Sequence, residues 1–230
     1  MTNTAAYTLL RSKRRTLSLS IDTQGALIVR APLHMPQRDI DAFIAQKQQW
    51  ITSKQALQQK RCSAALTLTG GTLLPLGNSR LTLRFAAVPF GMAYHGFLLL
   101  PCASDARESL KSWLLSQAQA FFLPLIAHYE ATLGLHPSAI RFSTSRTHWG
   151  SMNSKGLLRL NVCLMLCPTA IVDYIIVHEL AHMRHMSHSA AFWKLVEEWM
   201  PDYRDKRAWL SHNQHLILLL QSDSPADRSE

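Results

Sequence analysis

Hydrophobic and polar residues along the first hundred positions follow short alternating runs, which are typical of β-strands. Residues 15–21 (RTLSLSI) place Leu17, Leu19 and Ile21 on one face, and the turn signal DTQG separates them from the apolar run ALIVRA. Residues 35–60 instead repeat apolar side chains at helical spacing. Short apolar runs cut by Gly and Pro follow, as in further strands. This part of the chain is therefore expected to be mostly β, with one helix.

The second half of the chain has longer periodic segments. The spacing predicts a helix over 105–134 that ends at Gly134, and three later helices. Two strands are expected between them, AIRFSTS and LLRLNVCLML, with the turn residues of MNSKG in between. The three later helices are expected at 170–185, from Ser189 to about Met200, and over about 202–220.

These patterns predict an α+β fold in two lobes. Residues 1–102 are expected to form a small, basic, mostly-β N-terminal lobe with one helix, and residues 103–221 a second lobe richer in helices. The polar tail at 222–230 is expected to be disordered. No leader-like segment and no membrane-length apolar run is evident, so a cytoplasmic protein is expected.

Charge divides the chain unevenly. The net charge is +9, and residues 1–61 hold ten Lys and Arg against three Asp and Glu. Residues 169–230 instead hold six against nine, so the histidine-rich part of the sequence lies in an acidic third. A basic N-terminal lobe attracts anions, which makes nucleic acid a possible neighbour of this lobe.

The segment VHELAHMRHMSHSAAFW holds four of the eleven histidines and is the strongest functional signal. On a helix, residues four apart share a face, so His178 and His182 project side by side, with Glu179 one step round. This is H-E-x-x-H, in which two histidines bind zinc and the glutamate is the general base for zinc-bound water. A shuffled chain of this composition would contain the pattern only about 0.01 times.

A third ligand for one Zn²⁺ ion is expected at His188, six residues after His182. This spacing resembles that of metzincins, in which a glycine turn lies midway, although His185 occupies the glycine position here. Glu197 or Glu198 is the alternative, as in gluzincins. Three nitrogen ligands leave one position of a tetrahedral zinc open, which favours catalysis over a structural role.

The four cysteines form no C-x-x-C pair and are expected to be reduced and mostly buried. They are Cys62, Cys102, Cys163 and Cys167.

Long stretches of the sequence resemble the YgjP-like metal-dependent hydrolases, relatives of SprT-type and other zincin metallopeptidases. The resemblance rests on RTHWGSMNSKGLLRLNVCLMLCP, on IVDYIIVHELAHMRHMSHSAAFWKLV and on PDY, with a weaker match near the N-terminus. It implies a zincin-like catalytic lobe with His178, His182 and His188 as metal ligands and Glu179 as catalytic base. Nucleoside triphosphate pyrophosphohydrolase activity, from UTP to UMP and pyrophosphate, is also ascribed to this family.

Residues near the motif are candidates for substrate binding. Arg146, His148 and Trp149 offer a cation, a hydrogen-bond donor and a stacking face. Tyr203 and Arg204 are candidates for stabilising a transition state. The first functional hypothesis is a zinc peptidase, and the second is a nucleotide pyrophosphohydrolase. The third is a nucleic-acid- or partner-binding module whose metal is only structural.

Overall fold

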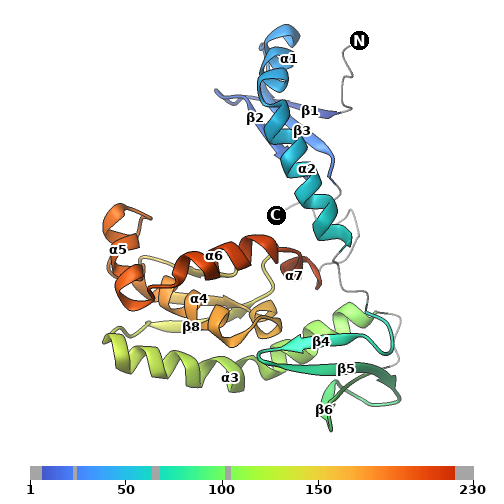
Figure 1. Ribbon diagram of the computed structural model, residues 1–230, viewed down its shortest axis with the longest axis vertical. Coiled ribbons are helices and arrows are strands. Elements are labelled where there is room, and N and C mark those ends of the chain that lie inside the picture. Colours follow the sequence, from blue (N-terminus) through green and yellow to red (C-terminus); the bar gives the residue numbers. More distant parts are fainter. Residues whose placement is uncertain (1–6, 23–24, 64–67, 102–104, 221–230) are drawn as a thin grey trace. The chain divides into compact units, whose positions relative to one another are not determined.

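The computed structural model describes residues 7–22, 25–63, 68–101 and 105–220, and the chain forms two compact units. The first unit covers Met1–Ala65 and the second Leu66–Glu230. Both combine helices and strands, so the predicted α+β class is confirmed. Figure 1 labels the elements of both units. The predicted tail at 222–230 lies outside the described residues.

The first unit is a three-stranded sheet with two helices. Strand β3 (Leu27–Pro32) lies between β1 (Tyr7–Ser12), which is parallel to it, and β2 (Ser18–Ile21), which is antiparallel. The two runs that DTQG separates therefore pair as an antiparallel hairpin. A small apolar core joins the sheet to the helices, and its fully buried side chains are Leu27, Val29, Ala31, Ile40 and Ile51.

The helix expected over 35–60 is in fact two helices, α1 (Gln37–Gln46) and α2 (Gln48–Ser63). They are separated at Lys47, whose backbone (φ −98°, ψ 10°) departs from helical geometry. The apolar spacing did not reveal this break. Buried Ile40 and Ile51 are eleven residues apart, which is about three helical turns, so the same pattern would fit one continuous helix.

The second unit begins with a four-stranded sheet in the order β4-β5-β7-β6. The strands are β4 (Leu73–Leu76), β5 (Ser79–Ala86), β6 (Met92–Tyr94) and β7 (Phe97–Pro101). Leu74, Leu83 and Leu98 of this sheet belong to the same buried cluster as the catalytic-lobe helices. The compact units therefore divide near residue 65 instead of at the predicted 102, because these strands bury their apolar face against the C-terminal helices.

Helix α3 (Ala106–Leu133) links the two sheets of the second unit, since it contacts both β7 and β8 (Ala139–Ser143). It begins and ends where the sequence predicts. The side chain of Asp105 caps the N-terminus by accepting hydrogen bonds from the backbone N–H groups of Arg107 and Glu108. Gly134 ends the helix in the left-handed conformation (φ 63°) that glycine adopts without strain.

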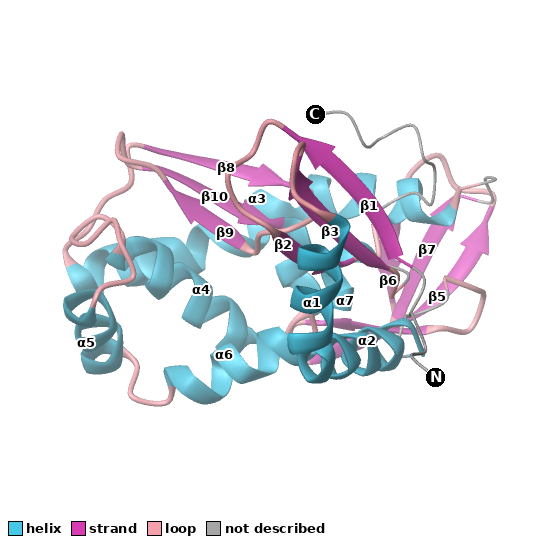
Figure 2. Cartoon of the chain, turned by 90° about the horizontal axis from the view of Figure 1, so that it is seen from above, coloured by secondary structure: helices cyan, strands magenta, loops and turns pink. Residues whose placement is uncertain are grey.

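The second sheet of this unit supports the functional site. Its order is β8-β10-β9, with β10 (Leu157–Asn161) parallel to β8 and antiparallel to β9 (Gly150–Met152). Helix α4 (Thr169–Ala181) packs against β9 and against α3. Figure 2 shows β9 as the strand of this sheet nearest to α4. A helix with nine of its thirteen residues buried therefore lies beside the edge strand of a sheet.

Three further helices complete the second unit, and two of them contact α4. Helix α5 (Ala190–Trp199) is capped by Ser189, as the sequence predicts. The helix expected over 202–220 is α6 (Tyr203–His212) followed by the short α7 (His215–Leu218). Every helix in the described part of the chain is too short or too polar to span a bilayer.

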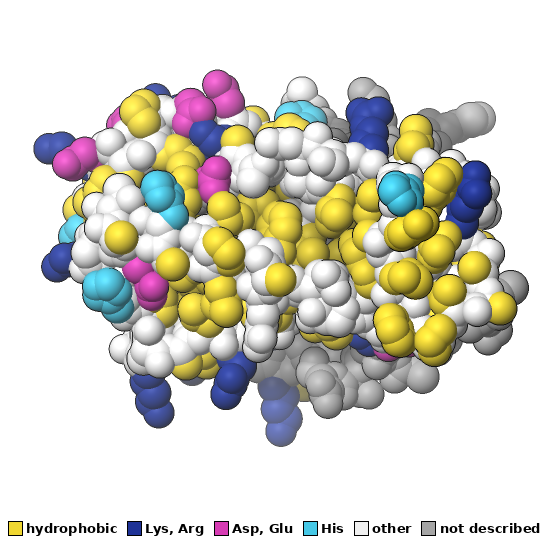
Figure 3. All heavy atoms as spheres, turned by 90° about the horizontal axis from the view of Figure 1, so that it is seen from below, with side chains coloured by type: hydrophobic (Ala, Val, Ile, Leu, Met, Phe, Trp, Pro, Cys, Tyr) yellow, Lys and Arg dark blue, Asp and Glu magenta, His cyan; other side chains and the backbone are white. Residues whose placement is uncertain are grey.

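Apolar side chains are exposed on the side of the second unit where α3 and β6 lie. Figure 3 shows this side, on which hydrophobic atoms gather between scattered charged groups. The exposed large side chains of α3 and the β6 region are Leu115, Leu123, Phe90, Met92 and Tyr94.

Cys163 and Cys167 are free and buried, as expected, whereas the side chains of Cys62 and Cys102 lie outside the described residues.

The strand predicted over 157–166 ends at Asn161, after which Val162–Leu166 form a 3₁₀ helix, η1. Asn161 is fully buried and connects three segments. Its side-chain amide donates to the backbone carbonyls of Ser145 and His148, and its side-chain oxygen accepts from the backbone N–H of Cys163. One buried side chain thus ends the strand and holds the preceding loop in place.

We expect Asn161→Ala to lower the free energy of unfolding by about 2–3 kcal/mol, because it leaves buried backbone groups without partners. Urea denaturation followed by circular dichroism measures the loss. Asn213→Ala is the matched control, since the Asn213 amide donates one local bond to Trp209. Its loss should stay below about 1 kcal/mol. Equal losses in the two variants would contradict the connecting role of Asn161.

Candidate metal site

Three histidines of the second unit converge on one point. Each of His178, His182 and His188 offers a ring nitrogen, and these atoms all lie within 4.8 Å of one another. The Nε2 atoms of His178 and His188 are 3.1 Å apart. Two nitrogens bound to one tetrahedral zinc at 2.0–2.1 Å would be roughly 3.3 Å apart. The geometry of the three rings therefore fits a single metal ion.

The turn after α4 brings His188 back to the helix. Helix α4 ends at Ala181, and the backbone N–H groups of Met183, Arg184 and His185 donate to carbonyls of its last turn. Among the described residues, His95 is the one non-glycine residue with a positive φ, so His185 does not adopt the conformation of the metzincin glycine. The chain makes this return through a tight helical turn instead.

Backbone and ring contacts orient the three imidazoles. The Nδ1 of His182 donates to the carbonyl of His185 at 3.0 Å, which leaves its Nε2 lone pair for a metal. The ring of buried Phe192 lies 4.5–5.0 Å from all three histidine rings, measured between centroids. His185 thus acts through its carbonyl, and Phe192 fixes the spacing of the rings.

Burial keeps His178 and His182 neutral. Desolvation, together with the nearby His182, His188 and Arg207, lowers the pKa of His178 to about 3, and desolvation is the largest of these causes. The pKa of His182 is also lowered by desolvation, against a raising effect of its bond to His185. Neutral imidazoles are the form that binds a metal, so these rings need lose no proton to do so at neutral pH.

Glu179 is the acidic group of the site and is only 5% exposed. Desolvation raises its pKa to about 8, opposed by a hydrogen bond from the backbone of Met152 on β9. A carboxyl group with a pKa near neutrality suits proton transfer at neutral pH. A bound cation would favour its ionised form.

Strand β9 approaches Glu179 so closely that only glycine fits at position 150. A Cβ atom placed on Gly150 would lie 2.8 Å from Oε1 and 2.9 Å from Cγ of Glu179. These distances are shorter than real Cβ contacts. Glycine is therefore required at position 150, because the backbone of β9 packs directly on the side chain of Glu179. Both residues line the cavity described next.

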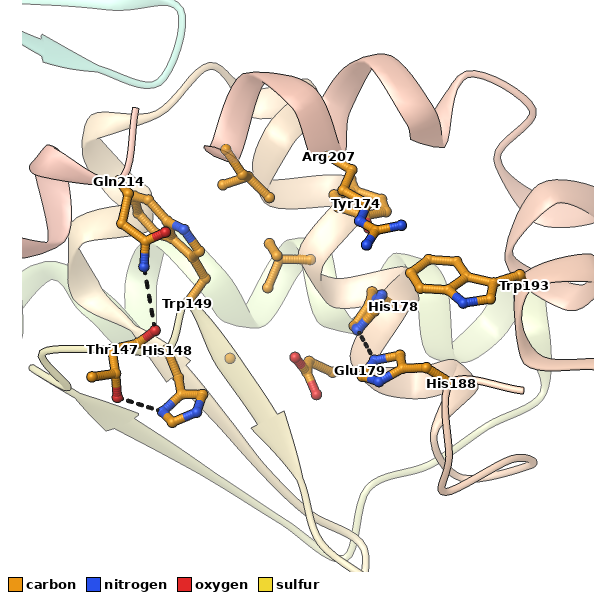
Figure 4. Close-up of a pocket in the computed structure, with 13 residues that line it drawn as sticks. Thr147, His148, Trp149, Tyr174, His178, Glu179, His188, Trp193, Arg207 and Gln214 are labelled. Atoms are coloured by element: carbon orange, nitrogen blue, oxygen red, sulfur yellow. Dashed lines mark hydrogen bonds between the residues drawn. The ribbon is translucent and has the colours of Figure 1, made fainter. Parts of the chain in front are cut away.

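A cavity of about 450 Å³ opens beside the histidines and Glu179. One side is formed by the loop before β9, and Figure 4 shows Thr147, His148 and Trp149 there. The other side carries aromatic and basic groups of the helices. Its labelled residues in Figure 4 are Tyr174, Trp193 and Arg207. A substrate entering this space would meet His178, His188 and the carboxyl group of Glu179 between two chemically different walls.

The structure separates the residues proposed from the sequence for substrate binding. His148 and Trp149 line the cavity, although Trp149 is mostly buried. Arg146 is exposed and is not among the lining residues. Tyr203 is buried and stacks on Trp193, with ring centroids 5.4 Å apart. Arg204 forms an ion pair with Glu197 at 3.0 Å, which places that alternative ligand outside the histidine cluster.

Three lining residues were missed in the sequence. Tyr174 precedes His178 by four residues, so the helical period that pairs the histidines also predicts its position. Trp193 follows the capping residue Ser189 by one helical turn and stacks on His188 at 5.4 Å. Arg207 gave no signal of its own, because its place depends on how α6 packs against α4.

Three clustered imidazoles and a buried carboxylate beside an open cavity define the class of metal-dependent hydrolases. The chain belongs to the YgjP-like family, whose model, described as a YgjP-like metallopeptidase domain, matches residues 15–213.

Two individual proteins resemble parts of the chain. The UTP pyrophosphatase of Escherichia coli (strain K12) is 32% identical over 83 residues, which are 34% of this chain and 47% of that protein. The match thus spans about half the length of that relative. The crystal structure of the metallopeptidase zymogen of Pyrococcus abyssi abylysin is 24% identical and covers 38% of this chain and 89% of its own, with a TM-score of 0.35.

The close approach at Gly150 yields a test by double-mutant cycle. We expect Gly150→Ala to destabilise the protein by about 1–3 kcal/mol in the wild-type background, because the methyl group meets Glu179. In a Glu179→Ala background the same change should cost about 1–2 kcal/mol less, since the clashing atoms are gone. Chemical denaturation of the four proteins gives both values. Equal costs in the two backgrounds would show that Glu179 is not what excludes a side chain at position 150.

Proposed function

We propose that the protein is a zinc-dependent hydrolase of the metallopeptidase type, in which His178, His182 and His188 hold the ion and Glu179 is the general base. The observation that carries this proposal is the position of Glu179. Its buried carboxyl group lies next to the three-histidine cluster, on the wall of an open cavity. A purely structural metal would need neither the cavity nor the carboxyl group.

The donor set favours zinc, because three imidazole nitrogens suit this ion better than Mg²⁺ or Ca²⁺, which prefer oxygen ligands. Zinc supplies Lewis acidity when bound, which lowers the pKa of water at the site and polarises a substrate carbonyl. Glu179 accepts the proton of the attacking water and delivers it to the leaving amine. Phe192 and the His185 carbonyl keep the imidazoles oriented during this transfer.

The edge strand beside Glu179 supports a peptide substrate. In its sheet β9 pairs with β10 and lies at the edge, next to α4. An extended peptide adds to such an edge through backbone hydrogen bonds. A peptide paired along β9 would pass close to Glu179, because Gly150 of this strand packs on the carboxyl side chain.

A second candidate is a nucleoside triphosphate pyrophosphohydrolase that converts UTP to UMP and pyrophosphate. It is supported by the Escherichia coli relative and by the guanidinium group of Arg207 on the cavity wall. The histidine donor set argues against it, because phosphoryl transfer usually recruits Mg²⁺ through oxygen ligands. The peptidase therefore remains the first candidate.

We expect the wild-type protein to bind one zinc ion per chain and His188→Ala to bind it at least 100-fold more weakly. His188 is exposed, so this change removes a ligand without opening the core. Equilibrium dialysis with elemental analysis measures binding, and circular dichroism confirms folding. His212→Ala is the control, because His212 is exposed on α6. Unchanged zinc binding by His188→Ala would exclude the proposed ligand set.

We expect Glu179→Gln to keep zinc and to lose roughly 100- to 10,000-fold in hydrolysis, the usual contribution of a general base. Two assays are run in parallel. The first measures peptide cleavage with unfolded proteins as substrates, and the second measures pyrophosphate release from a panel of nucleoside triphosphates. The assay in which wild type exceeds Glu179→Gln identifies the reaction. If wild type equals the variant in both assays while zinc is still bound, the metal is structural and the third hypothesis, a binding module, holds.

A further inference from the structure

Helix α6 carries three Lys or Arg residues, and their side chains have different kinds of partner. Arg204 pairs with Glu197 at 3.0 Å, and Lys206 pairs with Asp202 one helical turn away. Arg207 takes part in none of the ion pairs formed among the described residues. Its guanidinium carbon lies 4.8 Å from the centroid of the Trp193 ring. Arg207 is thus held by an aromatic ring instead of a carboxylate.

Arg207 also differs in what it faces. It lines the cavity, and Figure 4 shows its guanidinium group directed toward His178, with Tyr174 beside it. Among the lining residues Arg207 is the one Lys or Arg, and Glu179 is the one Asp or Glu. This cation therefore shares the space into which a substrate enters.

The charged groups at the site would sum to a net positive charge, which a negatively charged group of the substrate can neutralise. A divalent ion held by three neutral imidazoles adds two positive charges, Arg207 adds a third, and Glu179 supplies one negative charge. A guanidinium group offers two parallel N–H donors to a carboxylate or phosphate, and an aromatic ring beneath it fixes its plane. Trp193 is itself stacked between further rings, on His188 and on Tyr203. The donor is therefore preorganised before a ligand arrives.

We propose that Arg207, seated on Trp193, is an oxyanion-binding site that holds a negatively charged group of the substrate, a phosphate or a carboxylate, next to the bond to be cut. The proposal rests on the proposed function, because it assigns this group to the substrate of the metal site. It makes Arg207 a specificity residue of the cavity wall, and it gives Tyr203 a supporting role through the ring of Trp193.

Two small anions test the proposal, each with two acidic groups on one methylene carbon: methylenediphosphonate for phosphate groups and malonate for carboxylates. Isothermal titration to the zinc-loaded full chain compares wild type with Arg207→Ala, Arg207→Lys and Arg204→Ala. We expect wild type to bind at least one probe and Arg207→Ala to bind it at least tenfold more weakly. Arg207→Lys should fall in between, since an ammonium group lacks the paired donors. Arg204→Ala should match wild type, because Arg204 points to Glu197.

The outcomes separate the two proposals. Preference for methylenediphosphonate indicates a phosphate-bearing substrate, and preference for malonate a carboxylate-bearing one. If Arg207→Ala binds as wild type does, or if wild type binds neither probe, the oxyanion site is wrong even when zinc is bound and hydrolysis is observed. If zinc fails to bind, the proposed function is wrong, and the same titrations on the metal-free chain still show whether Arg207 binds an anion. Circular dichroism of each variant confirms that it is folded.

Discussion

The burial of polar groups on one apolar helix is the constraint on which the rest of this structure depends. Nine of the thirteen residues of α4 are buried, including Glu179, and buried His182 follows directly at its C-cap. Removing imidazoles and a carboxyl group from water is costly unless each gains a partner. Here the cost appears as the lowered pKa of His178 and the raised pKa of Glu179. A bound metal ion would offset both costs at once, because it needs neutral imidazoles and favours an ionised carboxylate.

The residues around α4 pack closely against its buried polar groups and hold them in place. The edge strand β9 approaches so closely that Gly150 has no room for a side chain beside Glu179. Phe192 contacts all three histidine rings from α5 and is itself fully buried. Asn161 holds the loop that forms one wall of the cavity. Glu179 and His182 are therefore embedded in close-packed structure, which fixes their relative positions more firmly than an exposed loop would.

Features that depend on interactions between residues close in the sequence could be predicted, whereas features that depend on contacts between distant residues could not. The pairing of His178 with His182 depends only on the helical period, and the ends of α3 and α5 depend on the local residues Asp105, Gly134 and Ser189. Those features could be predicted. The place of the strands 73–101 could not, because it is set by burial against helices far along the chain. The same holds for Arg207 and Gly150, whose roles depend on contacts with residues distant in sequence.

The charged groups that line the cavity, and not the net charge of the surrounding sequence, determine what can bind there. Residues 169–230 carry more acidic than basic side chains, yet the acidic residues Asp202 and Glu197 point at Lys206 and Arg204, away from the cavity. The cavity is lined by one carboxyl group, one guanidinium group and two of the three clustered imidazoles, those of His178 and His188. The metal chemistry is common to many substrates, so selectivity must come from the two walls. The edge strand β9 offers backbone groups to an extended chain, and Arg207 on Trp193 offers charge to an anion. A substrate that combines an extended backbone with a negative group would use both walls, whereas a nucleotide would use the basic one alone.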